Sequence, residues 1–255
     1  LSRFLSWPGK MIQNITTNEP DDSMIEVGIA ALEAVHFDGR IEVVETADAL
    51  ARACKILSKE RLIGFDTETR PSFQAGVTNK VSLLQLSTES HCFLIRINKL
   101  PLTRELLAIL SSERIIKIGA DVRNDISALN KLRHFTARGF IDLQNEVGKY
   151  GIEDKSLRKI SGIVLGKKVS KAQRLSNWEA KQLTPQQQMY AATDAWVCIS
   201  IYEKLMATEP IVKCGEESAP VAPTTLPIPK GENKKISNKQ PKEATDQSEK
   251  LGRPK

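Results

Sequence analysis

The chain is poor in residues that form disulfides and zinc sites. Its four cysteines are widely spaced without a CxxC pair, and its three histidines are scattered at His36, His91 and His134. Such a distribution argues against a zinc cluster and predicts free thiols in a reducing compartment.

Long apolar runs are also missing. No stretch approaches the roughly 20 apolar residues that span a bilayer. The N-terminal segment LSRFLSWPGKM is too interrupted to form the apolar core of a signal peptide. We therefore expect no membrane segment and a cytoplasmic location.

The chain nevertheless has enough residues and apolar content for a sizeable core. It has 255 residues, of which 40% are hydrophobic and 27% are charged, which is typical of a globular protein. The formal net charge of +6 favours a polyanionic partner, although charge alone is weak evidence.

Composition divides the chain into three parts. Beyond residue 208 there is no aromatic residue, and seven of the twelve prolines lie there. Such a segment cannot bury enough apolar surface to fold, so we predict a disordered basic tail at 209–255. Residues 1–23 are predicted to be a flexible arm. Met11 or Met24 is a candidate start of the natural chain, so residues 1–10 would lie upstream of that start. Residues 24–208 are predicted to form one domain.

Apolar periodicity predicts a mixed sheet covered by helices, an α/β fold. Strands are expected at residues 40–46, 62–68, 80–87, 91–97, 114–119 and 139–144. Helices are expected at residues 23–35, 46–57, 100–110, 124–132, 156–166 and 184–205. The last helix begins with Thr184, Pro185 and Gln187, which form a capping-box pattern.

Two acids follow an apolar strand in the segment GFDTET. Asp66 and Glu68 are two residues apart, so a strand directs both side chains to one face. Two carboxylates on one face raise each other's pKa unless a cation lies between them. The alternative is that both lie beyond the strand end, in water.

A third acid lies inside the predicted last helix, in the segment MYAATDAW. Asp194 is surrounded by apolar residues, and Tyr190 is one turn earlier on the same face. Burying an uncompensated carboxylate is costly, so Asp194 requires either a salt bridge or a metal ion.

The segment IIKIGADVRNDISAL contains two further candidates. Asp121 and Asp125 both follow a predicted strand that ends at Gly119. An acid at a helix start also complements the helix dipole, which is the simpler interpretation for each. We expect Asp121 to cap the helix and Asp125 to be the functional acid.

Together these acids predict a site for hard cations. Asp66, Glu68, Asp125 and Asp194 lie on three elements and have no matching cysteine or histidine cluster. Carboxylate oxygens favour Mg²⁺ or Mn²⁺ over zinc. Two such ions about 3.5–4 Å apart catalyse in-line displacement at phosphorus. The hydroxyl of Tyr190 would then be placed to hold or deprotonate the attacking water.

The motifs FDTET, RNDISAL and YAATDAW resemble those of the DEDDy 3′→5′ exonucleases, a family that includes ribonuclease D and the Werner syndrome exonuclease. The resemblance covers residues 40–207 and includes the segment before the last motif. It implies a ribonuclease H-like fold, with a mixed sheet of five or six strands and helices on both faces. It also implies that Asp66, Glu68, Asp125 and Asp194 bind two divalent metals and that Tyr190 orients the water.

The resemblance implies a two-metal 3′–5′ exonuclease that releases nucleoside monophosphates from DNA or RNA 3′ ends, with DNA slightly favoured. No obligate protein partner is implied. The alternatives are an RNA-trimming nuclease of the ribonuclease D type and an inactive nucleic-acid-binding module. A phosphatase with an Asp-x-Asp nucleophile is disfavoured because Glu68 replaces the second Asp. The predicted nucleic-acid contacts are Thr67, Arg70, Lys80, Arg123, Lys171 and Arg174.

Overall fold

The computed structural model describes residues 22–74, 76 and 78–211. Most of the predicted arm at 1–23 and of the predicted tail at 209–255 lies outside these residues. Within the described part, Cys54, Cys92 and Cys198 are free and buried. No helix of the described part is long and apolar enough to cross a membrane.

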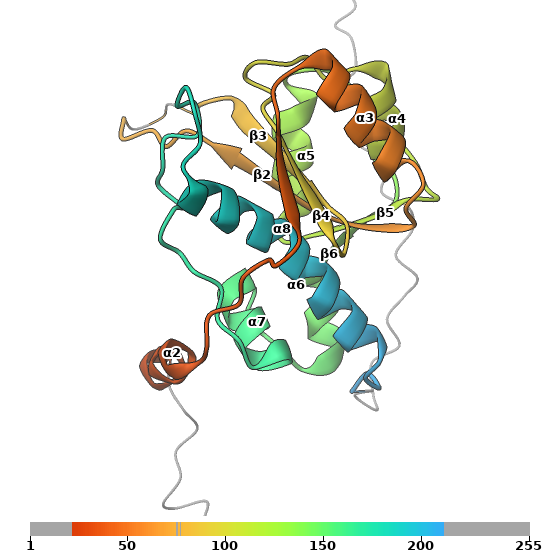
Figure 1. Ribbon diagram of the computed structural model, residues 1–255. Helices are drawn as coiled ribbons and strands as arrows, with labels where there is room; N and C mark the ends of the chain where they lie inside the picture. Colours follow the sequence, from red (N-terminus) through yellow and green to blue (C-terminus); the bar gives the residue numbers. More distant parts are fainter. Residues whose placement is uncertain (1–21, 75, 77, 212–255) are drawn as a thin grey trace, which may run out of the picture. The chain divides into compact units, whose positions relative to one another are not determined.

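Six strands form one mixed sheet, as the α/β prediction requires (Figure 1). Their order is β1-β4-β3-β2-β5-β6. Strands β2, β3 and β4 are antiparallel neighbours, whereas the pairs β1–β4, β2–β5 and β5–β6 are parallel. The strands are β1 (Arg40–Val44), β2 (Leu62–Thr69), β3 (Val81–Ser87), β4 (His91–Ile95), β5 (Ile116–Gly119) and β6 (Phe140–Asp142).

Helices pack on both faces of the sheet. Apolar residues of α3, α4 and α5 share one core cluster with alternate residues of β2, β3 and β4, and α8 packs on the opposite face with α7 (Figure 1). The helices are α2 (Asp22–Ala31), α3 (Ala47–Leu57), α4 (Arg104–Leu110), α5 (Val122–Asn130), α6 (Leu143–Glu146), the 3₁₀ helix η1 (Val147–Tyr150), α7 (Leu157–Leu165) and α8 (Pro185–Met206).

Local sequence signals explain several element ends. The predicted capping box is present, because the side chains of Thr184 and Gln187 each bind the other's backbone. Gly166 ends α7 with a φ of 63°, a left-handed conformation that favours glycine. The predicted helix at 100–110 begins only at Arg104, since Pro101 precedes it and Thr103 caps it.

Helix α8 lies directly against β2. Ile63 and Phe65 face the cluster on the α3 side, so Gly64 faces α8. A Cβ atom added at Gly64 would overlap the carbonyl oxygen of Ala195. The missing side chain therefore lets the backbone of α8 approach the strand, next to the position of Asp194.

Two cations hold the segment that leads into α8. Arg96 is fully buried, pairs with Glu45 at 3.1 Å and donates to the carbonyl oxygen of Ala180 at 2.6 Å. Lys99 donates to the same glutamate at 2.7 Å and to the carbonyl oxygen of Lys181 at 2.9 Å. Charge-assisted hydrogen bonds thus hold the segment before α8 against the end of β4.

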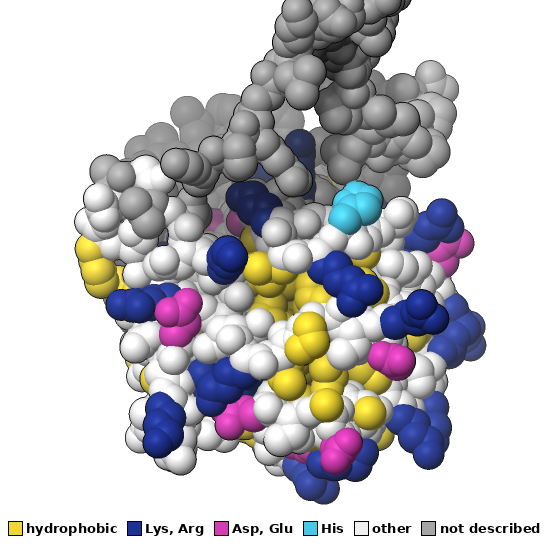
Figure 2. All heavy atoms as spheres, turned by 90° about the horizontal axis from the view of Figure 1, so that it is seen from above, with side chains coloured by type: hydrophobic (Ala, Val, Ile, Leu, Met, Phe, Trp, Pro, Cys, Tyr) yellow, Lys and Arg dark blue, Asp and Glu magenta, His cyan; other side chains and the backbone are white. Residues whose placement is uncertain are grey.

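The surface around α3 and α4 is of mixed charge. Figure 2 shows Lys and Arg side chains distributed around this face together with Asp and Glu, and apolar side chains between them. The positive charge on this face therefore does not form one continuous stripe.

Candidate active site

Three acids converge between β2 and α8. Asp66 and Glu68 occupy alternate positions of β2 on the face toward α8, and Asp194 approaches from the middle of that helix. One carboxylate oxygen from each of the three lies within 4.8 Å of the others. The structure therefore brings together three of the four acids predicted to bind metal.

Burial disfavours ionisation of all three acids, and repulsion adds to this effect at Asp66 and Glu68. Burial raises the pKa of Asp66 well above its usual value, and the charges of Asp125, Glu68 and Asp194 raise it further. Burial and the charge of Asp194 raise the pKa of Glu68 to about 9. Burial also raises the pKa of Asp194 to about 7. The three carboxyl groups therefore favour their protonated forms unless a cation compensates the ionised ones.

One oxygen of this cluster lacks a partner. In the described part of the chain, Oδ1 of Asp194 is buried without a hydrogen bond. Gln85, Arg96 and Trp178 also have buried side-chain atoms without a partner, but the Asp194 oxygen belongs to a group of carboxylates, where a cation would supply one. A set of carboxylate oxygens fits a hard divalent cation such as Mg²⁺ or Mn²⁺.

The fourth predicted acid lies beside this group and has a different partner. Asp125 is in the first turn of α5, and its Oδ1 accepts a hydrogen bond from the Thr67 hydroxyl at 2.5 Å. Burial raises its pKa to about 7, although the bond from Thr67 opposes that shift. Its bond to Thr67, which lies between Asp66 and Glu68 in β2, places Asp125 beside the three-acid group, and its charge raises the pKa of Asp66.

Asp121 occupies the predicted N-cap position of α5 but does not cap the helix. Its exposed side chain makes no capping bond and accepts from the amide of Asn124, while its φ of 64° is left-handed. Asp142 caps the helix instead, because its carboxylate accepts hydrogen bonds from the backbone N–H groups of Asp121 and Val122 at 3.2 and 3.0 Å. The prediction of a side-chain cap from Asp121 was therefore wrong.

Asp142 was missed by sequence reasoning. It also accepts from the backbone of Gln144 at 3.0 Å, so one carboxylate fixes the starts of two helices. An acid directly after a short apolar strand was the available signal, the same one that identified Asp66 and Asp125.

Tyr190 lies one turn before Asp194 on α8. Its hydroxyl lowers the pKa of Asp194, which opposes the effect of burial. Burial, followed by the charge of Asp194, raises the Tyr190 pKa far above its usual value, so the hydroxyl stays protonated and can donate. The ring of Trp178 is fully buried, and its centroid lies 6.1 Å from that of the Tyr190 ring.

The predicted cationic contacts lie on exposed segments. Arg70 forms an ion pair with Glu179 at 3.4 Å, which links the loop after β2 to the segment before α8. Thr67 is half-buried on β2, where its hydroxyl holds Asp125. The other four predicted contacts are exposed: Lys80, Arg123, Lys171 and Arg174.

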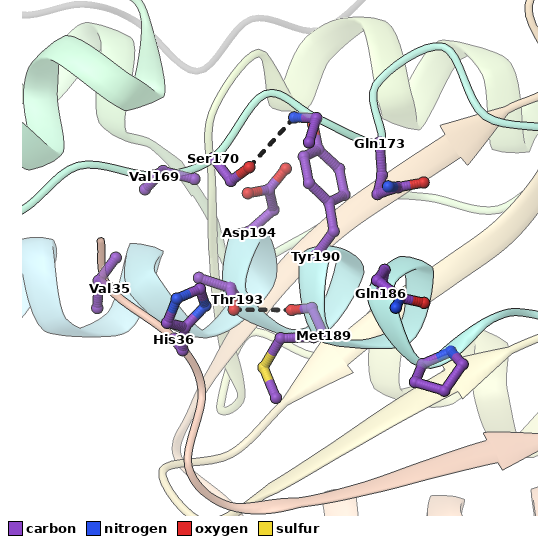
Figure 3. A pocket seen from close by; sticks show the side chains of 12 residues that line it. Val35, His36, Val169, Ser170, Gln173, Gln186, Met189, Tyr190, Thr193 and Asp194 are labelled. Carbon is purple, nitrogen blue, oxygen red and sulfur yellow. Dashed lines mark hydrogen bonds between the residues drawn. The ribbon is translucent and has the colours of Figure 1, made fainter. Parts of the chain in front are cut away.

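A cavity of about 370 Å³ is lined in part by Asp194 and Tyr190, and sequence reasoning missed it. Figure 3 shows Tyr190 and Asp194 projecting from α8 toward the segment that carries Ser170, with His36 and Met189 across the helix in this view. We term this cavity the α8 pocket. In the sequence, His36 was considered only as a potential metal ligand. No local pattern predicted that His36 would line this cavity.

A family model described as 3′–5′ exonuclease matches residues 41–208. A second model, described as a protein of unknown function, matches residues 1–37. The matched exonuclease region contains every acid of the cluster and ends two residues after α8.

Similar curated proteins carry exonuclease names. The mouse bifunctional 3′–5′ exonuclease/ATP-dependent helicase WRN is 32% identical over 80% of this chain and 15% of its own length. A 3′–5′ exonuclease of Arabidopsis thaliana is 29% identical over 68% of this chain and 65% of its own. This chain thus spans less than two thirds of the length of either relative.

Solved structures share the fold. The Nibbler EXO domain of Aedes aegypti has a TM-score of 0.60 at 24% identity, covering 68% of this chain and 92% of that one. Escherichia coli RNase D has a TM-score of 0.60 at 25% identity, covering 66% of this chain and 44% of that one. Together with the six-stranded sheet, these similarities confirm the predicted ribonuclease H-like fold.

Proposed function

The chain belongs to the 3′–5′ exonuclease family, and from this premise we propose that it removes nucleoside monophosphates from the 3′ end of a nucleic acid by hydrolysis. The observation that carries the proposal is the group of carboxylate oxygens from Asp66, Glu68 and Asp194, all within 4.8 Å. This donor set suits divalent cations, and it lies beside a protonated tyrosine.

We assign the acids and the tyrosine to the DEDDy type of site. Asp66, Glu68 and Asp194, with Asp125 beside them, would hold two ions of Mg²⁺ or Mn²⁺. Such ions supply the acid–base chemistry and the charge stabilisation of in-line displacement at phosphorus. The orphaned Oδ1 of Asp194 supports this ligand role, since a cation would provide its missing partner.

Tyr190 positions the reacting water in this proposal. Its hydroxyl lowers the pKa of Asp194 and remains a donor, because its own pKa is raised. The Trp178 ring packs near it and limits its movement. Tyr190 would therefore orient the water without binding a metal itself.

Thr67 and Asp125 act as a pair. The 2.5 Å hydrogen bond orients the Asp125 carboxylate from β2. The backbone around Thr67 is the proposed contact for the terminal nucleotide. Exposed cations would bind backbone phosphates, namely Arg70, Lys80, Arg123, Lys171 and Arg174.

The substrate is proposed to be DNA in preference to RNA. The similarity to the mouse WRN protein, at 32% identity, supports an exonuclease of that type. RNA 3′-end trimming is the second candidate, and the 25% identity to Escherichia coli RNase D supports it. An inactive binding module is disfavoured, because all four acids and Tyr190 are present.

A time course on 5′-labelled DNA and RNA of the same sequence tests this proposal. With Mg²⁺ or Mn²⁺, we expect a ladder that shortens one nucleotide at a time from the 3′ end, and EDTA should abolish it. Shortening of the labelled end first, or cleavage that is unaffected by EDTA, would contradict the proposal. The ratio of the DNA and RNA rates decides between the two substrates.

A further inference from the structure

Gln85 is a buried amide without a hydrogen-bond partner. It lies on β3, its side chain is fully buried, and neither Nε2 nor Oε1 bonds to any group in the part of the chain that the structure describes. A primary amide has two N–H donors and an accepting oxygen, so several hydrogen bonds are unmade. Burying such a group without partners is costly, and its position therefore requires an explanation beyond packing.

Gln85 faces α8 and lies directly opposite Asp66. Its chain neighbours Leu84 and Leu86 belong to the core cluster on the other face of the sheet, so the alternation of the strand points Gln85 toward α8. In the antiparallel pair of β2 and β3, the register sets Gln85 against Asp66. Directly opposed side chains have Cβ atoms about 4.5–5.5 Å apart, a gap that a glutamine side chain can reach across.

The other side chains next to Gln85 on this face are poorer acceptors. Leu83, two residues earlier on β3, and Leu94, opposite Gln85 on β4, are apolar. The hydroxyl of Ser87, two residues later, already donates to a backbone carbonyl oxygen at 2.8 Å. A carboxylate accepts stronger hydrogen bonds than a neutral group does, so Asp66 is the best acceptor among these neighbours for Nε2 of Gln85.

Another of the proposed metal ligands already has a support of this kind. The hydroxyl of Thr67 on β2 donates to the carboxylate of Asp125 at 2.5 Å. Carboxylates that bind a metal are normally held by hydrogen bonds, which fix their orientation. Gln85 is fully buried and does not line the α8 pocket, so it can act on the reaction only through Asp66.

We propose that Gln85 is a positioning residue for Asp66, whose carboxylate it fixes by a hydrogen bond from Nε2 when a divalent cation is bound. This inference rests on the proposed metal site. Cation binding provides the condition for the bond, because a ligand carboxylate is ionised and then accepts from an amide. The amide thus lacks a partner in the metal-free protein and gains one in the metal-bound protein.

Gln85→Met tests this proposal, because methionine keeps an unbranched side chain of similar length and removes the amide. Mn²⁺ titrations followed by the electron paramagnetic resonance signal of the free ion should give a Kd about tenfold weaker than that of the wild type, as is typical when a ligand loses its orienting hydrogen bond. At a fixed Mn²⁺ concentration, kcat should fall as well, while KM for DNA stays the same. A changed KM with an unchanged kcat would overturn the proposal.

Unfolding in EDTA separates positioning from packing. Gln85→Met removes an amide that is buried without a partner, so its urea midpoint should equal or exceed that of the wild type. An amide that supports the metal-free fold would give the opposite pattern. A lower urea midpoint together with an unchanged Kd for Mn²⁺ would therefore overturn the proposal.

Leu83→Met is the matched control. Leu83 is fully buried two residues earlier on the same face of β3, opposite Glu68 on β2, and it has no donor to lose. Leucine and methionine have similar volumes, so the Kd for Mn²⁺ should stay close to that of the wild type. Equal weakening in Leu83→Met and Gln85→Met would assign the effect to repacking and overturn the proposal.

The same titration distinguishes this proposal from the proposed function. If the wild type and Gln85→Met bind Mn²⁺ with equal Kd, the positioning role is overturned while the metal site stands. If the wild type binds no Mn²⁺, the metal site is contradicted and the positioning role with it. A weaker Kd in Gln85→Met alone supports both.

Discussion

Two groups of buried charge lie near α8, and they differ in what surrounds them. Arg96 is fully buried but has an ion pair with Glu45 and bonds to two backbone carbonyl groups. Asp66, Glu68 and Asp194 have one another as neighbours, and their pKa values are raised. One group is electrostatically balanced by the protein, whereas the other is not.

This difference separates a structural role from a functional one. The balanced group stabilises the fold, because Arg96 pairs with Glu45 after β1 and donates to the Trp178 and Ala180 carbonyl groups before α8. The acid cluster lowers the stability of the metal-free protein as pH rises, since burial and neighbouring charges oppose ionisation of its carboxyl groups. Perturbed carboxylates of this kind are typical of catalytic and metal sites.

The largest effect is expected from a substitution in the unbalanced group of three acids. Asp194→Asn should lower the exonuclease rate by roughly a thousandfold, because a ligand of the proposed metal site is lost. The same change should raise Tm in EDTA, since it removes a buried like charge. Labelled-DNA assays and thermal unfolding measure both effects. Near-normal cleavage by this variant would contradict the site assignment.

Breaking the balanced group should act on stability instead. Arg96→Met removes the donors to the Trp178 and Ala180 carbonyl groups and should cost about 2–3 kcal/mol in the free energy of unfolding. Urea unfolding measures this change. The control is Arg138→Met, which breaks an exposed ion pair with Glu113 and should change stability by less than about 1 kcal/mol. An equal loss of unfolding free energy in the two variants would contradict the structural role given to Arg96.

The acid cluster should also make stability depend on pH. Its carboxyl groups have pKa values raised to about 7 for Asp194 and about 9 for Glu68, so the folded state binds more protons than the unfolded one. Stability from this source is complete below about pH 4 and falls as pH rises toward 9. In EDTA, the free energy of unfolding should fall by several kcal/mol between pH 5.5 and 8.5, of which Asp194 alone contributes about 2 kcal/mol.

Saturating Mg²⁺ should reduce this pH dependence, because the cation favours the ionised carboxylates. Asp194→Asn should reduce it as well, without metal. Urea unfolding at several pH values provides the measurement. A wild-type stability that rises steadily over this range in EDTA would show that other groups dominate.

The smallest expected effect separates the tyrosine from the acids. Tyr190→Phe should lower kcat about tenfold, the size of one lost hydrogen bond in the reaction. The Mg²⁺ concentration for half-maximal activity should stay the same, since the hydroxyl contacts the water and Asp194 but not the metal. A large shift in that Mg²⁺ titration would assign Tyr190 to metal binding.

Sequence predicted the parts of the site that depend on local pattern. Alternation in β2 and the one-turn spacing on α8 place Asp66, Glu68, Tyr190 and Asp194 on facing surfaces. The capping box at Thr184 fixed the start of α8 for the same reason. Each of these signals lies within a few residues of the feature that it predicts.

The remaining parts depend on contacts between distant segments. The bond from Thr67 to Asp125 spans 58 positions, and that from Phe37 to Thr193 spans 156. No local pattern gives Asp121 its left-handed conformation, which rests on the carboxylate of Asp142. Arg96 had the same signal as Asp194, a charge inside an apolar run, but only the structure shows that its charge is balanced.

Counting bound Mn²⁺ ions tests the metal site most directly. Electron paramagnetic resonance follows the loss of the free Mn²⁺ signal when the ion binds the protein, here titrated with deoxyadenosine 5′-monophosphate present. We predict two ions per chain for the wild type and a loss of at least one in Asp66→Asn. An unchanged free-ion signal in the presence of the wild type, or equal binding by both proteins, would contradict the account.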